Sequence, residues 1–65
     1  MPSSVISRIN YDPRSFILRV FFLSGSVYDY LDVPRRIYQA MKKAESKGTF
    51  LNNHIKGHYM FRKIG

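Results

Sequence analysis

Hydrophobic and polar positions alternate through the first half of the chain, a period of two that predicts β-strands. The first run ends at Asp12-Pro13-Arg14-Ser15, a combination typical of a type I turn, and its alternating positions are Val5, Ser7, Ile9 and Tyr11. Residues 16–23 and 27–33 form two further runs rich in β-branched and aromatic side chains, separated by Ser24-Gly25. Three short strands with tight turns predict an antiparallel meander.

From Pro34 the period changes to that of an amphipathic helix, whose apolar positions are Ile37, Ala40, Met41 and Ala44. Proline suits the first turn of a helix, and Asp32 can accept hydrogen bonds from the free amides there. Gly48 is expected to end the helix in a left-handed C-cap.

The last part of the chain is too apolar for a disordered tail: Phe50, Leu51, Ile55, Tyr59, Met60, Phe61 and Ile64. Asn52 or Asn53 can cap a short helical turn that Gly57 ends, and residues 58–64 can form a last strand. The predicted fold class is α+β, as one domain over residues 1–65. It comprises a three-stranded antiparallel meander, one amphipathic helix, a short helical turn and room for a final short strand.

The loop between the second and third strands decides where Tyr28 and Tyr30 point. A three-residue loop, Leu23-Ser24-Gly25 with Gly25 left-handed, turns both tyrosines toward the core and sets Arg19 opposite Asp29 outside. A two-residue loop moves Asp29 onto the apolar face, where an unpaired charge costs several kcal/mol. We therefore predict the three-residue loop, with the tyrosines in the core rather than forming a platform for bases.

The same reasoning extends to both faces of the sheet. For the first hairpin it predicts the cross-strand pairs Asp12–Ser15, Tyr11–Phe16, Ile9–Leu18 and Val5–Phe22. The predicted core face is then Val5, Ile9, Tyr11, Leu18, Val20, Phe22, Tyr28 and Tyr30. The opposite face keeps Ile17, Phe21, Leu23, Val27 and Leu31. So much exposed apolar surface predicts a cover, either the C-terminal segment or another molecule such as a second copy or a protein partner.

Charge is segregated along the chain. The net charge is +7, and residues 34–65 carry all of it through eight Lys and Arg residues against the single Glu45. The predicted helix turns Arg35, Arg36, Lys42 and Lys43 away from its apolar face. Such a face suits an anionic partner, with RNA or another polyanion foremost, and a solvated surface that only solubilises the helix is the open alternative. The candidate nucleic-acid contacts are Arg35, Arg36, Lys42, Lys43, Lys47, Lys56, Arg62 and Lys63.

Composition removes several other classes of function. Without cysteine the chain has neither disulfides nor thiolate metal sites, and His54 and His58 lack a third ligand nearby. Four scattered carboxylates and no glycine-rich phosphate loop predict a protein that is not an enzyme and uses no cofactor or small-molecule substrate. The longest apolar run, Val20 to Leu23, is too short for a membrane, and residues 1–7 lack a secretion signal, so we expect a soluble cytoplasmic protein.

The order and spacing of several motifs resemble the KTSC domain. They are Leu18-x-Val20-x-Phe22, Gly25, Tyr28-x-Tyr30, Val33-Pro34, Tyr38, and Ser46-Lys47-Gly48-Thr49-Phe50-Leu51-Asn52 followed by Ile55 and Tyr59. The resemblance covers roughly residues 4–61. This family is named for the C-terminal extension of some lysyl-tRNA synthetases and includes free-standing bacterial proteins. The resemblance implies RNA as a partner by that association alone, and it brings no catalytic residues.

Overall fold

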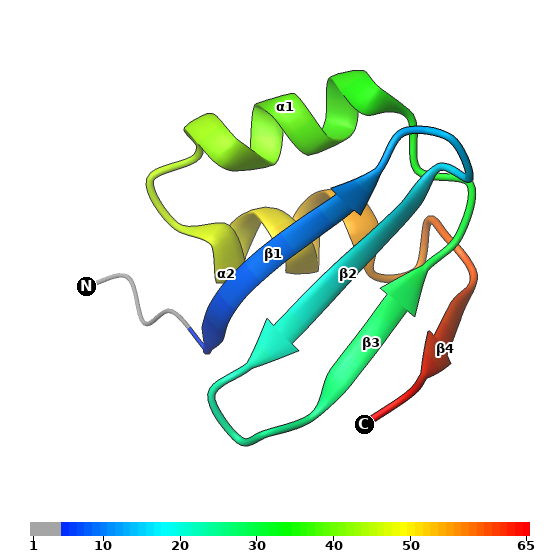
Figure 1. Ribbon diagram of the computed structural model, residues 1–65. Helices are drawn as coiled ribbons and strands as arrows, with labels where there is room; N and C mark the ends of the chain where they lie inside the picture. The colour runs from blue at the N-terminus through cyan, green and yellow to red at the C-terminus, as the bar shows by residue number, and fades with distance from the viewer. Residues whose placement is uncertain (1–4) are drawn as a thin grey trace.

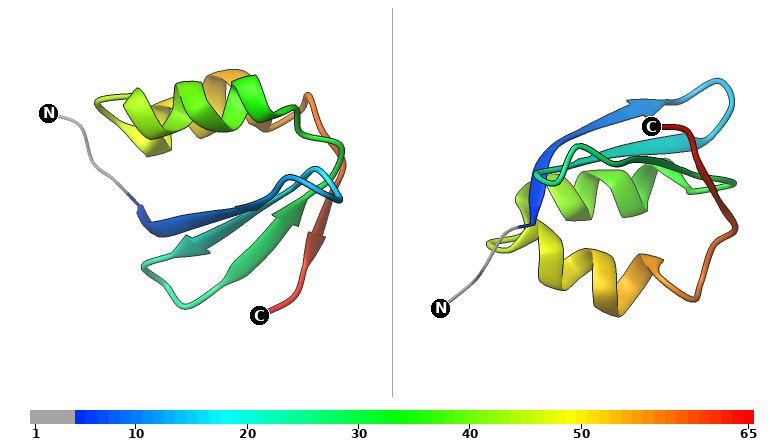
Figure 2. Two further views of the ribbon diagram at one scale, coloured as in Figure 1. Left: turned by 45° about the horizontal axis from the view of Figure 1, so that its top comes forward. Right: turned by 90° about the horizontal axis from the view of Figure 1, so that it is seen from below.

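The computed structural model describes residues 5–65 as two layers, a four-stranded antiparallel sheet with helices on one face (Figures 1 and 2). The strands are β1 (Ile6–Asp12), β2 (Ile17–Phe22), β3 (Val27–Tyr30) and β4 (Phe61–Lys63), in the order β1-β2-β3-β4. Between β3 and β4 the chain forms α1 (Arg35–Lys43), α2 (Lys47–Phe50) and the π-helical η1 (Leu51–Ile55). The predicted α+β class and meander are confirmed, and a last strand forms within residues 58–64.

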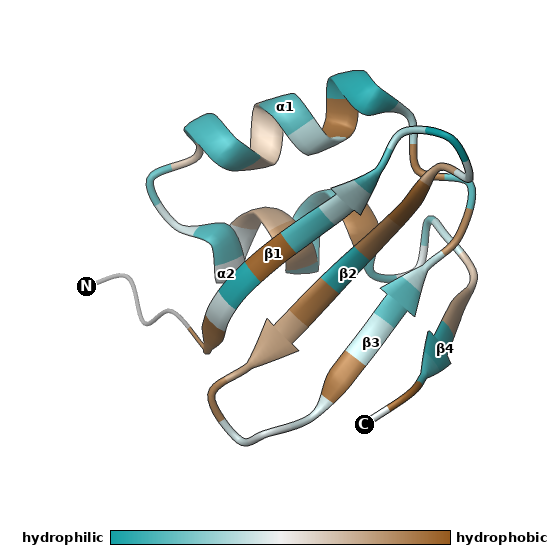
Figure 3. Cartoon of the chain, in the orientation of Figure 1, coloured by the Kyte–Doolittle hydropathy of each residue, from teal (hydrophilic) through white to brown (hydrophobic). Residues whose placement is uncertain are grey.

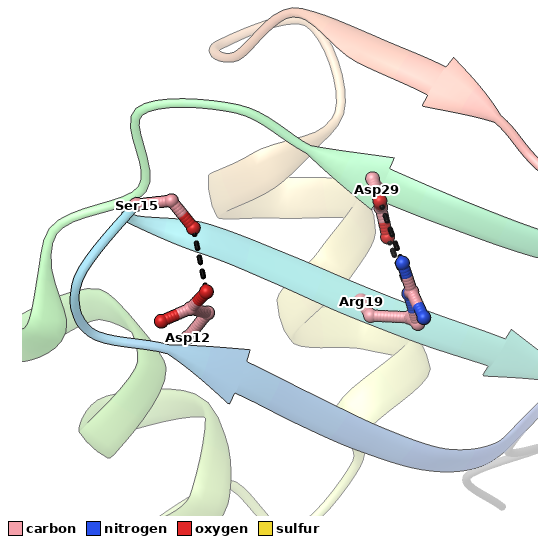
Figure 4. A network of polar contacts seen from close by, with 4 residues as sticks. All are labelled: Asp12, Ser15, Arg19 and Asp29. Atoms are coloured by element: carbon pink, nitrogen blue, oxygen red, sulfur yellow. Dashed lines mark hydrogen bonds and ion pairs between the residues drawn. The ribbon is translucent and has the colours of Figure 1, made fainter.

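The hairpin of β2 and β3 has the predicted register. Val20 pairs with Tyr28, Leu18 with Tyr30 and Arg19 with Asp29, and Gly25 has a φ of 98°. Arg19 donates two hydrogen bonds to the Asp29 carboxylate, from Nε at 2.8 Å and from Nη2 at 3.1 Å (Figure 4). Asp29 is only 3 % exposed, so its charge is matched where it is buried.

The first hairpin differs from the prediction in its register and in a bulge. Its pairing is shifted by two residues, so that Tyr11 pairs with Leu18 and not with Phe16, and Ile9 with Val20 and not with Leu18, because the turn takes in residues 13–16. The Asp12 carboxylate accepts a hydrogen bond from the Ser15 hydroxyl at 2.8 Å (Figure 4). It accepts a second from the Arg14 amide at 3.0 Å, and the two bonds close the turn locally. Phe16 follows with a φ of 58° and is 49 % exposed, so it belongs to the turn and not to the strand pair with Tyr11 that was predicted.

A β-bulge near the start of β1 makes the second difference. Ile6 pairs with Phe22 while Arg8 pairs with Phe21, which leaves Ser7 as the extra residue. For the residues before Ser7, the bulge exchanges the positions that face the core and the positions that face solvent. Ile6 therefore packs into the core, and Val5, predicted to do so, is 53 % exposed.

The predicted single long helix is two separate elements. α1 ends at Lys43, and Ser46 starts α2 by accepting a hydrogen bond from the Thr49 amide at 3.2 Å. A serine at this position is a strong N-cap, so the backbone restarts a helix here instead of ending one. Gly48 is accordingly buried inside α2 and is not a C-cap.

Two further helix predictions are corrected in the same region. Asp32 does not cap α1, whose N-cap is Pro34 without a side-chain hydrogen bond. Asp32 instead adopts a left-handed φ of 57° in the β3–α1 connection. Asn52 and Asn53 lie inside η1 and do not start it. Gly57 does take the left-handed conformation, with a φ of 81°, directly after this helical segment.

The core lies between the sheet and the helices. Its fully buried side chains come from β2, the β3–α1 connection, α1 and η1, and they are Leu18, Val20, Val33, Met41, Leu51 and Ile55. Figure 3 shows the apolar stripe that β2 contributes. Ala40, predicted to face inward, is exposed instead. None of the helices within residues 5–65 is long and apolar enough to cross a membrane.

Candidate functional site

Four of the predicted contact residues form one surface on α1. Arg35, Arg36, Lys42 and Lys43 are all exposed, and at 100° per residue they span an arc of about 120° on the side away from buried Met41. The helix contains no acidic residue in its first turn. We call these four side chains the basic helix face, and its geometry is the one the sequence predicts.

Aromatic rings lie beside two of these cations. Lys42 places its Nζ 5.5 Å from the centroid of the Tyr38 ring, and Tyr38 stacks on Tyr11 with centroids 4.7 Å apart and planes at 13°. Burial raises the pKa of Tyr11, and the positive charge of Arg35 offsets part of that rise. The Tyr11 hydroxyl also donates to the Val33 carbonyl at 2.6 Å, so this stack ties α1 to β1.

The other four predicted contacts lie elsewhere. Lys47 begins α2 and is half-buried, and Lys56 follows η1. Arg62 pairs with Asp29 in the sheet, on the outer face, while Lys63 pairs with Tyr28 on the inner face. The eight cations therefore form one compact face of four with the remainder distributed around the domain.

A pocket of about 460 Å³ opens on the inner face of the sheet, near β4. Lys56 and Gly57 border it on the side of the helical segment, and Ser24 and Ser26 border it at the β2–β3 loop. Its rings come from β2, β3 and β4, and they are Phe22, Tyr28, Tyr30 and Phe61. We call this site the aromatic pocket.

The rings of the aromatic pocket contact one another. Tyr28 meets Phe22 edge to face at 5.4 Å and 83°, and Phe61 lies 5.5 Å from Tyr28 and 5.8 Å from Tyr30. Tyr30 is 3 % exposed and Phe61 58 %, with Tyr28 half-buried between them. The prediction that both tyrosines point toward the core is therefore confirmed. Tyr28 also lines the aromatic pocket.

Sequence reasoning missed this pocket because Phe61 reaches it through the pairing of β4 with β3. The available signal was the alternation of Phe61, Arg62 and Lys63, which puts the first and third side chains on one face of a strand. The partner and register of such a short strand do not follow from that alternation.

The outer face of the sheet is less apolar than predicted. Arg8 places its guanidinium carbon 4.2 Å from the Phe21 centroid, and the Arg19–Asp29 pair occupies the middle of the face. The last two residues form backbone hydrogen bonds with Val27. The Val27 amide donates to the Gly65 carbonyl at 3.0 Å, and the Ile64 amide donates to the Val27 carbonyl at 2.8 Å. The tail thus covers one edge of this face.

The histidines do not form a metal centre. His54 packs against the ring of Phe50 with centroids 4.5 Å apart. Across residues 5–65, no three His, Cys, Asp or Glu side chains are grouped to bind a metal ion.

The fold is that of a small α+β domain. The three-stranded meander and the edge strand β4 form one sheet, and the helices cover one face of it. The chain belongs to the KTSC domain family, whose family model matches residues 2–59. The resemblance seen in the sequence is thereby confirmed.

Relatives occur both inside larger proteins and alone. A lysine–tRNA ligase of Nostoc punctiforme is 38 % identical over 61 residues, which are 94 % of this chain and only 11 % of the ligase. An uncharacterized protein of Stutzerimonas stutzeri is 38 % identical over 65 residues, 98 % of this chain and 92 % of that protein. The crystal structure of a KTSC domain protein from Yersinia pestis has 42 % identity and a TM-score of 0.89, covering 100 % of this chain and 94 % of the other.

Proposed function

We propose that this domain is a non-enzymatic module that binds RNA through the basic helix face. The observation that carries the proposal is the exposure of four cations along one side of α1, with no acid in the first turn of that helix. Cations spaced in this way neutralise phosphates and release condensed counterions, which yields affinity without sequence preference.

Two further observations support RNA as the polyanion. The net charge of +7 is large for 65 residues, and four of the eight cations of residues 34–65 are gathered on α1, which favours a polyanionic partner. A similar segment also occurs within lysine–tRNA ligases, proteins named for a reaction on tRNA.

The test is a charge reversal on α1 with a matched control. We expect Lys42→Glu with Lys43→Glu to abolish binding to labelled tRNA, measured by fluorescence anisotropy. The control, Arg8→Glu with Arg14→Glu, changes the formal charge equally at exposed positions of the first hairpin and should weaken binding only slightly. Equal losses in both variants would refute a role for this particular face.

A second candidate function is protein docking or homodimerisation on the outer face of the sheet. Leu23 favours it, being 70 % exposed at the Phe21 end of that face, whose other apolar side chains Ile17, Phe21 and Leu31 are half-buried. Phe21→Asp should then break a dimer that sedimentation detects in the unmodified protein, while circular dichroism stays unchanged. A strictly monomeric protein would rule out homodimerisation.

A further inference from the structure

The aromatic pocket lies where the helices leave the inner face of the sheet open. In Figure 2 the helical layer faces β1 and β2, while β4 extends beyond it. The side chains that β4 turns inward, Phe61 and Lys63, are consequently both exposed. At about 460 Å³ the pocket falls within the usual size of small-ligand sites.

Aromatic faces dominate the lining. Phe61 contacts Tyr28 and Tyr30 at 5.5 and 5.8 Å yet remains 58 % exposed, so part of its ring is available to a guest. Flat π-systems stack on such rings with little regard to their substituents, and nucleobases do so in many single-strand binding proteins. The lining therefore favours a flat, unsaturated guest.

The charge around the pocket selects the kind of guest. Lys56 borders the pocket, and Lys63 is the cross-strand partner of Tyr28 in β4. Within the described part of the chain, no carboxylate is among the residues that line the pocket. A cationic guest would be repelled by the two lysines and by the net charge of the protein. A flat guest that carries negative charge fits both features.

We propose that the aromatic pocket binds one unpaired base of single-stranded RNA, with the neighbouring phosphates at Lys56 and Lys63. This inference rests on the proposed RNA binding and specifies the part of the ligand that enters the domain. A base inside a duplex has both faces stacked on its neighbours, so only a strand, a loop or a bulge presents a base to the pocket.

The test separates the base from the phosphates by comparing hexauridylate with an abasic strand of six phosphodiester-linked riboses. The protein variant is Phe61→Leu, which removes the ring and keeps an apolar side chain at a largely exposed position. Its matched control is Phe16→Leu, since Phe16 is similarly exposed at 49 % and lies in the β1–β2 turn, outside the pocket. Titration by NMR reports the affinity and the shifts of the ring protons together.

We expect the unmodified protein and Phe16→Leu to bind hexauridylate about tenfold more tightly than the abasic strand, as stacking of one base implies. Phe61→Leu should bind both strands equally, and the ring protons of Tyr28 should move upfield only with the base-bearing strand. A preference that survives Phe61→Leu, or no preference in the unmodified protein, would overturn the pocket proposal.

The two proposals fail in different ways. Salt-dependent binding of both strands without a base preference overturns the pocket and leaves the basic helix face intact. If Lys42→Glu with Lys43→Glu leaves the affinity for hexauridylate unchanged and the base preference intact, the pocket is supported and the helix face is overturned as the main source of affinity.

Discussion

Through the basic helix face alone, raising the salt concentration from about 50 to about 200 mM should weaken the binding of single-stranded RNA about 50-fold. The magnitude follows from the basic helix face. If each of its four cations meets one phosphate, the slope of log K against log salt concentration is about −2.8 for a single strand. A fourfold rise in salt concentration then lowers the binding constant K by about 4 to the power 2.8, which is about 50-fold.

Neutralising half of the face makes the prediction specific to α1. In Lys42→Gln with Lys43→Gln two phosphate contacts are lost, the slope falls to about −1.4, and the same change in salt weakens binding only about sevenfold. Glutamine is a good helix former, so α1 should remain folded. Fluorescence anisotropy with a labelled dodecauridylate at five salt concentrations measures both slopes.

Two results would contradict this reasoning. A slope near zero in the unmodified protein would show that phosphate neutralisation is not the source of affinity. A slope that the two glutamines leave unchanged would show that phosphates bind away from α1. A slope of about −4.2 would instead correspond to six phosphates, the number expected when Lys56 and Lys63 each contact one as well.

Three further predictions concern stability. Ser46→Ala removes the cap that accepts from the Thr49 amide at 3.2 Å, and should cost about 1 kcal/mol, seen as a melting temperature lower by about 4–8 °C. Tyr11→Phe loses the 2.6 Å hydrogen bond to the Val33 carbonyl and keeps the stacked rings, so urea titration should show a loss of about 1 kcal/mol. Burial, together with nearby Tyr28, raises the pKa of Tyr30 above 10.0, so the folded state binds that proton more tightly than the unfolded state. The free energy of unfolding should therefore fall as pH rises above about 10, and Tyr30→Phe should flatten that fall in urea titrations.

The parts of the fold that were predictable are those in which one register is far worse than its competitor. A slip of one residue in the second hairpin would bury Asp29 without Arg19, so the pairing follows from the charge. In the first hairpin the predicted and observed registers differ by two residues, so both turn Ile9, Tyr11 and Leu18 inward, and a local side-chain contact at Asp12 decides between them. The bulge at Ser7 leaves no comparable signal in the sequence.

The helical region shows a signal that was present and misread. Ser46 followed by Lys47, Gly48 and Thr49 is a helix start, and the glycine within it resembles a helix stop. The basic helix face was nevertheless predictable, because a period of 3.6 assigns positions to sides of a helix wherever that helix ends. The aromatic pocket was not, because it combines Phe61 with residues of β2 and β3 from far along the chain.

The three-residue strand β4 has a consequence for motion. All three of its residues are exposed, and in the described sheet it is an edge strand that pairs with β3. Just before β4 begins, the Met60 carbonyl accepts a hydrogen bond from the Leu31 amide at 2.8 Å. Strands of this kind open at a small fraction of the global unfolding free energy. Amide hydrogens of β4 should therefore exchange with solvent earlier than those of β2. Each such opening would move Phe61 away from Tyr28 and Tyr30 while the meander and the helices stay folded. The aromatic pocket would therefore lose one of its walls for as long as β4 is detached.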